Sequence, residues 1–122
     1  MYLFDLERLA EFKENAPGVR VIAQSGHARY ILFTFRAGQG LREHSTSSQI
    51  AVQLLSGQLT FTARGESHEL QPGHLLLLEA NVPHTLHAQT DAILLLMLTP
   101  DPQHHSLAAD LFDKIQPLAT LS

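Results

Sequence analysis

Two stretches of sequence decide the fold: residues 40–57, GLREHSTSSQIAVQLLSG, and residues 71–84, QPGHLLLLEANVPH. Each contains short apolar runs broken by glycine or proline, and in each a histidine stands in a strand-like setting, His44 in the first and His84 at the end of the second. Short strands punctuated by turn residues are typical of a small β-barrel. If the two strands close against each other, His44 and His84 meet inside that barrel.

The same pattern extends outward on both sides of these stretches. Runs rich in Val, Ile, Leu, Phe and Tyr alternate with turn residues, and Gly57, Gly65 and Gly73 fall at the expected hairpin corners. Strands are predicted over residues 19–24, 29–36, 41–44, 49–55, 58–63, 67–70, 74–78, 84–88 and 92–98. The chain is therefore expected to be an all-β barrel or sandwich.

Two short helices are predicted to flank the strands. Asp5 can cap the first helix, in which Leu6, Leu9 and Phe12 recur every three residues and form one buried face. The second helix is predicted over about residues 106–116, where leucine and isoleucine recur every four residues before a proline. We expect residues 1–122 to form one domain, with the barrel over about residues 19–99.

Composition excludes several classes of function. The chain has no cysteine, so it can form neither disulfides nor thiolate metal sites. Its net charge is −4 and its eight Lys and Arg are scattered, which argues against nucleic acid and against a membrane surface as partners. The longest apolar run, residues 92–98, is too short to cross a bilayer. The first residues lack the pattern of a signal peptide, and we expect a cytoplasmic protein.

Together the two stretches resemble the motifs of the cupin superfamily, in particular its small single-domain bacterial members. The first cupin motif is roughly G-x5-H-x-H-x3,4-E-x6-G and is matched by His44 to Gly57; the second is matched by Gly65, the Pro72-Gly73 turn and the Pro83-His84 strand entry. The resemblance covers about residues 30–98. It implies a double-stranded β-helix (jelly-roll) barrel, here with short N- and C-terminal helices.

The resemblance also implies a metal site, which this sequence keeps only in part. Cupins bind their metal with three histidines and one glutamate, and His44 and His84 match two of these ligands. Thr46 stands where another histidine is expected, and we place Gln49 at the position of the glutamate. The implied set is His44, His84 and Gln49 around one divalent ion (zinc, nickel, iron or manganese), bound less tightly than by the full set.

Two interpretations of these residues remain open. In the first, the histidines bind a metal. In the second, they line a metal-free polar pocket, where their rings are hydrogen-bonded to Gln49 or to water. Gln49 and Gln53 share one face of a strand, so they face together either inward, where they would contact a ligand, or outward to solvent. Leu86 and Thr46 complete the candidate ligand-binding residues.

We therefore expect a cupin that binds a small organic ligand in its barrel. The alternative is a metal-dependent cupin enzyme, of the dioxygenase or isomerase type, that uses His44 and His84. Both faces of the strand over residues 49–55 are largely apolar, and the same holds for residues 92–98. One face can fill the barrel and the other needs a cover, so we also expect a homodimer.

Overall fold

The computed structural model describes residues 1–101 of the chain and contains nine strands and one helical turn in that part. Their bounds agree with the predicted strands to within one residue at nearly every end. The elements are α1 (Leu6–Leu9), β1 (Gly18–Gln24), β2 (Arg29–Phe35), β3 (Gly40–His44), β4 (Gln49–Ser56), β5 (Leu59–Ala63), β6 (Glu66–Leu70), β7 (Leu75–Leu78), β8 (His84–Ala88) and β9 (Ala92–Thr99).

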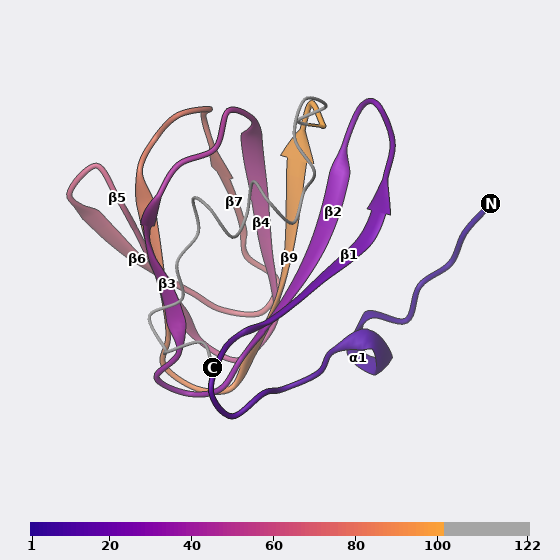
Figure 1. The fold of residues 1–122 in the computed structure, drawn as a ribbon. Coiled ribbons are helices and arrows are strands. Elements are labelled where there is room, and N and C mark those ends of the chain that lie inside the picture. The colour runs from indigo at the N-terminus through magenta and orange to yellow at the C-terminus, as the bar shows by residue number, and fades with distance from the viewer. Residues whose placement is uncertain (102–122) are drawn as a thin grey trace.

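The strands form two antiparallel sheets that face each other (Figure 1). The first sheet has the order β1-β2-β9-β4-β7 and the second the order β3-β8-β5-β6. No strand of one sheet pairs with a strand of the other in the described residues, so the expected closed barrel is instead an open sandwich. The all-β class is confirmed, and the two-sheet arrangement fits a jelly roll.

The core lies between the sheets and follows the two-residue period of a strand. On β4 the inward residues are Ile50, Val52 and Leu54, all buried in the main apolar cluster. On the facing sheet, Phe61 and Leu86 belong to the same cluster. Alternation along each strand therefore determines which side chains the interior contains.

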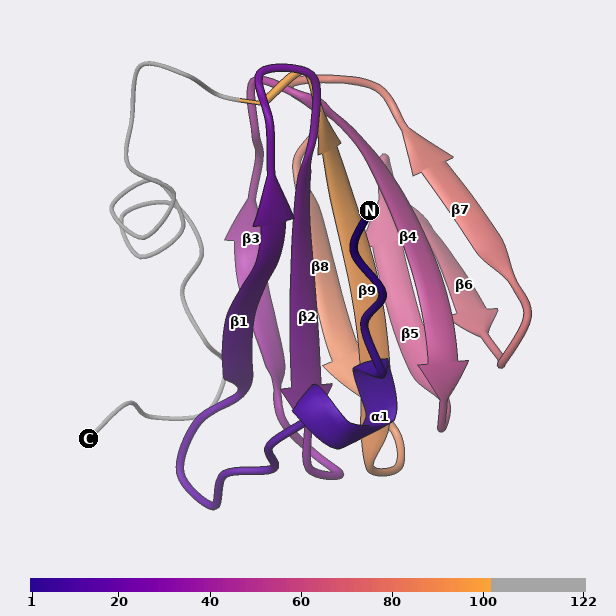
Figure 2. The same ribbon diagram turned by 90° about the vertical axis from the view of Figure 1, so that its right-hand side faces the viewer.

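The N-terminal helix is shorter than predicted. The Asp5 side chain accepts a hydrogen bond from the backbone N–H of Arg8, as an N-cap should, but α1 ends at Leu9 and none of its residues is buried. Figure 2 shows α1 and the preceding residues on the outer side of the five-stranded sheet. The predicted buried helical face is therefore wrong, because an extended segment replaces the helix before Phe12.

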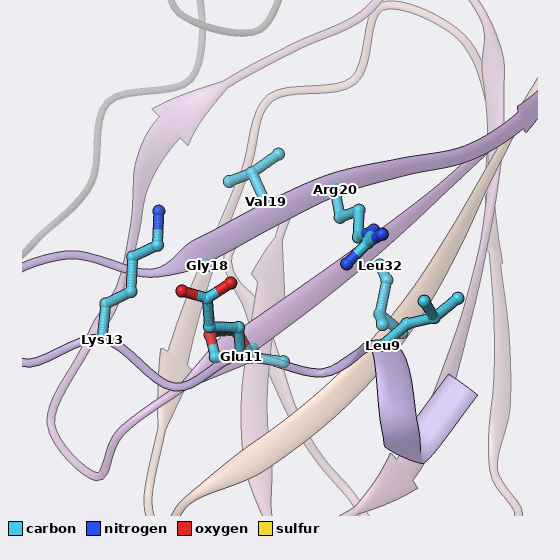
Figure 3. Close-up of a pocket in the computed structure, with 8 residues that line it drawn as sticks. Leu9, Glu11, Lys13, Gly18, Val19, Arg20 and Leu32 are labelled. Atoms are coloured by element: carbon cyan, nitrogen blue, oxygen red, sulfur yellow. Dashed lines mark hydrogen bonds between the residues drawn. The ribbon is translucent and has the colours of Figure 1, made fainter. Parts of the chain in front are cut away.

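This extended segment packs on the outer side of β1 and β2 (Figure 3). Leu9 and Leu32 line a small cavity of about 80 Å³ there, and the Thr34 hydroxyl donates a hydrogen bond to the Glu11 carbonyl. A Cβ on Gly18 would overlap both Thr34 and the Glu11 carbonyl. The contact therefore requires glycine at this position.

A buried ion pair ties the end of β9 to the start of β2. Arg29 Nε lies 2.7 Å from Asp101 Oδ1, and both side chains are more than nine-tenths buried. Beside it, Ser48 Oγ donates to the Pro100 carbonyl at 2.7 Å. The Ser48 hydrogen bond ties the loop of residues 45–48, which connects His44 to β4, to the residue that follows β9.

The second predicted helix, over residues 106–116, lies outside the described residues. Within residues 1–101, no helix has the length and hydropathy needed to span a membrane.

Candidate functional site

The structure brings His44 and His84 together, as the sequence predicts. They are direct partners in the pairing of β3 with β8, and their ring centroids lie 4.2 Å apart at an interplanar angle of 63°. His44 is 7% exposed and His84 is 2% exposed. The two imidazoles therefore form a buried pair at the end of the sandwich where β3 ends and β8 begins.

A β-bulge turns His44 inward. Leu41 pairs with Leu86 and His44 pairs with His84, so three steps along β3 match two steps along β8. The extra residue leaves Arg42 and Glu43 both exposed, whereas simple alternation would place them on opposite faces. Bulges of this kind re-aim side chains next to functional sites.

The backbone fixes the tautomer of both rings. His44 Nδ1 lies 2.6 Å from the Arg42 carbonyl, and His84 Nδ1 lies 2.9 Å from the Val82 carbonyl. A carbonyl oxygen only accepts, so each Nδ1 must carry the proton and donate it. In the neutral rings, each Nε2 then presents a lone pair, and neither Nε2 has a hydrogen-bond donor among residues 1–101.

Burial keeps both rings neutral. The pKa of His44 is lowered from 6.5 to about 4: desolvation is the main cause, the hydrogen bond to the Arg42 carbonyl opposes it, and the nearby His84 adds a smaller lowering. Desolvation likewise lowers the pKa of His84, against the opposing hydrogen bond to Val82. The pair is therefore uncharged at neutral pH and offers two hydrogen-bond acceptors.

Aromatic and aliphatic side chains surround the pair. The Phe61 ring stacks on His84, with centroids 5.2 Å apart and planes 11° from parallel. Leu86 follows His84 on the same face of β8 and is a fully buried core residue. Phe61 could not be singled out from the sequence, because its place beside His84 depends on the pairing of β5 with β8.

Gln49 and Gln53 do not face the histidines. Both are exposed on the outer side of β4, and Ile50 occupies the inward position, 1% exposed. Of the two orientations left open by the sequence, the structure has the outward one, so Gln49 does not reach the histidines as the third ligand that the family resemblance implies. Three residues separate Thr46 from Ile50 and six separate Ile50 from Gly57, so the motif spacing itself already favoured Ile50 as the residue at the glutamate position.

Thr46 is half-buried in the loop after β3. Its hydroxyl donates to the Ser48 carbonyl at 2.9 Å, and its own carbonyl accepts a hydrogen bond from the Asn81 backbone N–H at 2.7 Å. The threonine thus links the loop before β4 to the loop before β8. Its hydroxyl hydrogen is engaged within its own loop.

The donor set does not fit the metal centre of a full cupin motif. One expected ligand position holds Thr46, and the carboxylate position holds the hydrocarbon side chain of Ile50. Among residues 1–101, no group of three or more His, Cys, Asp or Glu side chains is arranged to hold a metal ion. Only the two imidazole nitrogens remain, and catalytic metal sites generally use three protein ligands.

A cleft of about 380 Å³ lies between the edge strands β6 and β7, and neither His44 nor His84 lines it. Its walls combine apolar and polar side chains, namely Phe61, Ala63, Arg64, Glu66, His68, Leu76, Leu77, Leu78 and Glu79. Phe61 connects the cleft to the histidines, because it lines the cleft and stacks on His84.

An ion pair joins the two sides of the cleft at its rim. Arg64 Nη2 lies 2.9 Å from Glu79 Oε2, and this hydrogen bond is the main reason that the pKa of the Glu79 carboxyl is lowered. Arg64 belongs to the turn between β5 and β6, whereas Glu79 follows β7. The contact therefore crosses the gap between the two sheets.

Comparison with known proteins identifies the chain's relatives. Residues 31–99 match the family described as "Cupin domain". Among solved structures, a Thermus thermophilus protein is 27% identical, with a TM-score of 0.77 over 84% of this chain and 100% of its own. An RmlC-like cupin protein from Desulfovibrio desulfuricans is 24% identical, with a TM-score of 0.76 over 82% of this chain and 97% of its own.

A conserved protein of unknown function from Streptococcus pyogenes is 23% identical, with a TM-score of 0.73 over 82% of this chain and 88% of its own. No curated protein matches the chain.

Proposed function

Because the chain belongs to the cupin family, and because its histidine pair lacks the other two ligands of the family's metal motif, we propose that it is a small-molecule-binding protein. The ligand would lie in the cleft between β6 and β7, at whose inner wall Phe61 stacks on His84. The observation that carries this proposal is the buried, neutral His44–His84 pair, in which the His84 ring stacks on Phe61, a residue of the cleft wall.

The chemistry of the two rings supports a ligand with a hydrogen-bond donor. Because each Nδ1 donates to a backbone carbonyl, each neutral Nε2 can accept a hydrogen bond from a hydroxyl, an N–H group or a water molecule.

The cleft indicates the size and character of the ligand. Its volume lies near the lower end of the range usual for small-molecule sites, roughly 300–1,000 Å³. Leu76 and Leu78 provide apolar contact on one side, and Glu66 and His68 provide polar groups on the other. We propose a compact organic molecule that has an apolar body and at least one hydroxyl or N–H donor.

A divalent ion is not needed for this function. Two neutral imidazoles could hold zinc or nickel only weakly, because no carboxylate adds charge to the pair. The enzyme hypothesis needs a further ligand that residues 1–101 do not supply. Binding without chemistry is therefore the function that we propose.

A fragment library of alcohols, phenols and amides tests the proposal by thermal shift. We expect some members to raise the melting temperature of the parent protein, and Ala63→Phe to abolish that shift by filling the cleft. Thr62→Phe is the matched control, since Thr62 lies one residue away on the opposite face of β5. If no fragment shifts the parent, or if Ala63→Phe responds as the parent does, the proposed site is wrong.

A further inference from the structure

One row of directly paired residues crosses the four-stranded sheet at the end where the histidines lie. The row contains, in order, His44, His84, Ala63 and Glu66. All four are on the inward side of the sheet, since Glu66 has the parity of Leu70, a core residue of the same strand. Ala63 has the smallest side chain of the four, so the row has a gap between an imidazole and a carboxylate. Both Ala63 and Glu66 line the cleft between β6 and β7.

Of the two acidic side chains that line this cleft, Glu66 is the one without a close cationic partner among residues 1–101. Glu79 lies 2.9 Å from Arg64, whose guanidinium neutralises its charge. Glu66 Oε2 lies 3.4 Å from His68 Nε2, whereas charge-assisted hydrogen bonds usually measure about 2.7–2.9 Å. With His68 neutral, the charged groups that line the cleft leave it with one net negative charge, located on Glu66.

The other edge strand contributes a hydrocarbon wall to the cleft. Leu76 and Leu78 lie on the inward side of β7, where they pair with the core residues Val52 and Ile50. The cleft thus offers a carboxylate from one edge strand and an apolar surface from the other. This arrangement is the complement of a molecule with a cationic head and an apolar body.

We propose that the ligand of this cleft is an organic amine, an inference that rests on the proposed function. The ammonium group lies over Ala63 and donates its N–H groups to the Glu66 carboxylate. The apolar body lies against Leu76 and Leu78.

The charges of the cleft predict an order of affinity for ligands of one shape. An amine makes an ion pair with Glu66, and an alcohol makes a hydrogen bond without the ion pair. A carboxylate is repelled by Glu66, and it reaches Arg64 only by displacing Glu79. The expected order is therefore amine, then alcohol, then carboxylate.

An inward charge on an edge strand has a second physical use, because it discourages pairing with another strand. Glu66 belongs to β6, which is an edge strand. If this were its whole role, Glu66→Gln would change self-association and leave the affinity for amines as it is. The two roles therefore differ in a measurable way.

Titrations of the full chain with benzylamine, benzyl alcohol and benzoate, followed by NMR, test the inference, because the three probes share one ring and differ in one group. At neutral pH and low salt we expect benzylamine to bind about fivefold more tightly than benzyl alcohol, the upper limit for an exposed ion pair, and benzoate to bind most weakly. Glu66→Gln should bring the affinities of benzylamine and benzyl alcohol to within about twofold of each other.

Glu69→Gln is the matched control, because it removes the same charge from an exposed residue on the outer side of the same strand. It should bind the three probes as the parent does. Equal affinities of the parent for benzylamine and benzyl alcohol overturn the inference, and so does an equal effect of Glu66→Gln and Glu69→Gln. Melting curves of each variant identify any that fail to fold.

Failure of the inference can be told from failure of the proposed function. If benzyl alcohol binds as tightly as benzylamine and Ala63→Phe abolishes its binding, the cleft is a binding site without preference for amines. If none of the three probes binds the parent, the inference is wrong, and the response of the fragment library to Ala63→Phe decides separately on the proposed function.

Discussion

At the scale of single residues, the site contains fewer polar side chains than the sequence predicts. His44 and His84 lie together, whereas Gln49 faces the outer side of β4. His44 and His84 could be predicted because two motifs about forty residues apart both point to them. The orientation of Gln49 could not be read from parity alone, since both faces of β4 are largely apolar. A glutamate in place of Gln49 would therefore point away from the histidines.

The low pKa values of the pair predict a pH dependence of stability. Above pH 6.5 the histidines are neutral in both the folded and the unfolded chain. As the pH falls from 6.5 to about 4, the unfolded chain binds protons at the histidines and the folded chain does not. The free energy of unfolding therefore decreases across this range. The lowered pKa of His44 alone should reduce the free energy of unfolding by about 3 kcal/mol across this pH range.

Urea unfolding at several pH values between 7 and 4 measures this loss. His44→Gln removes one of the two groups, so we expect its free energy of unfolding to depend less on pH than that of the parent. His87→Gln is the control, because His87 is exposed on the other face of β8 and should follow the parent. Parallel curves for His44→Gln and the parent would show that His44 is not held neutral by burial.

At the scale of elements, turns and strands could be predicted well, and the irregular features could not. Gly57, Gly65 and Gly73 all have positive φ, as turn glycines should, but only Gly65 lies at a hairpin corner, between the paired strands β5 and β6. The hairpin role predicted for Gly57 and Gly73 is wrong, because the turns that contain them lead from one sheet to the other. The bulge in β3 has no signature in residues 40–44, because it arises from pairing with a strand forty residues later. The end of α1 at Leu9 likewise depends on the extended segment that packs on β2.

Two of these turn glycines should respond very differently to alanine. At Gly57 (φ 88°) a Cβ would overlap the Asp91 carbonyl and press on Ala92, whereas at Gly65 (φ 76°) nothing lies within 4 Å. Gly65→Ala should therefore cost only backbone strain, about 1–2 kcal/mol. Gly57→Ala adds a steric clash and should cost about 3 kcal/mol or more.

Chemical denaturation of both alanine variants compares these costs directly. Equal losses of stability would contradict the close approach of the β4–β5 turn to the segment before β9.

At the scale of the whole molecule, the family and the all-β class could be predicted from the sequence, whereas the cleft and the unpaired edges of the two sheets could not. The cleft exists because β6 and β7 are the last strands of separate sheets and do not pair. That arrangement depends on the order of all nine described strands. The histidine pair near this cleft keeps two ligands of the cupin metal motif, and Thr46 and Ile50 stand where the motif has its other two.

Metal content tests this claim most directly. The protein should be purified without an affinity tag, dialysed at neutral pH without chelator, and analysed by elemental mass spectrometry. We expect well below one equivalent of any transition metal per chain, because two neutral imidazoles hold an ion too weakly to survive dialysis. One tightly held equivalent of zinc, nickel, iron or manganese per chain would contradict the account.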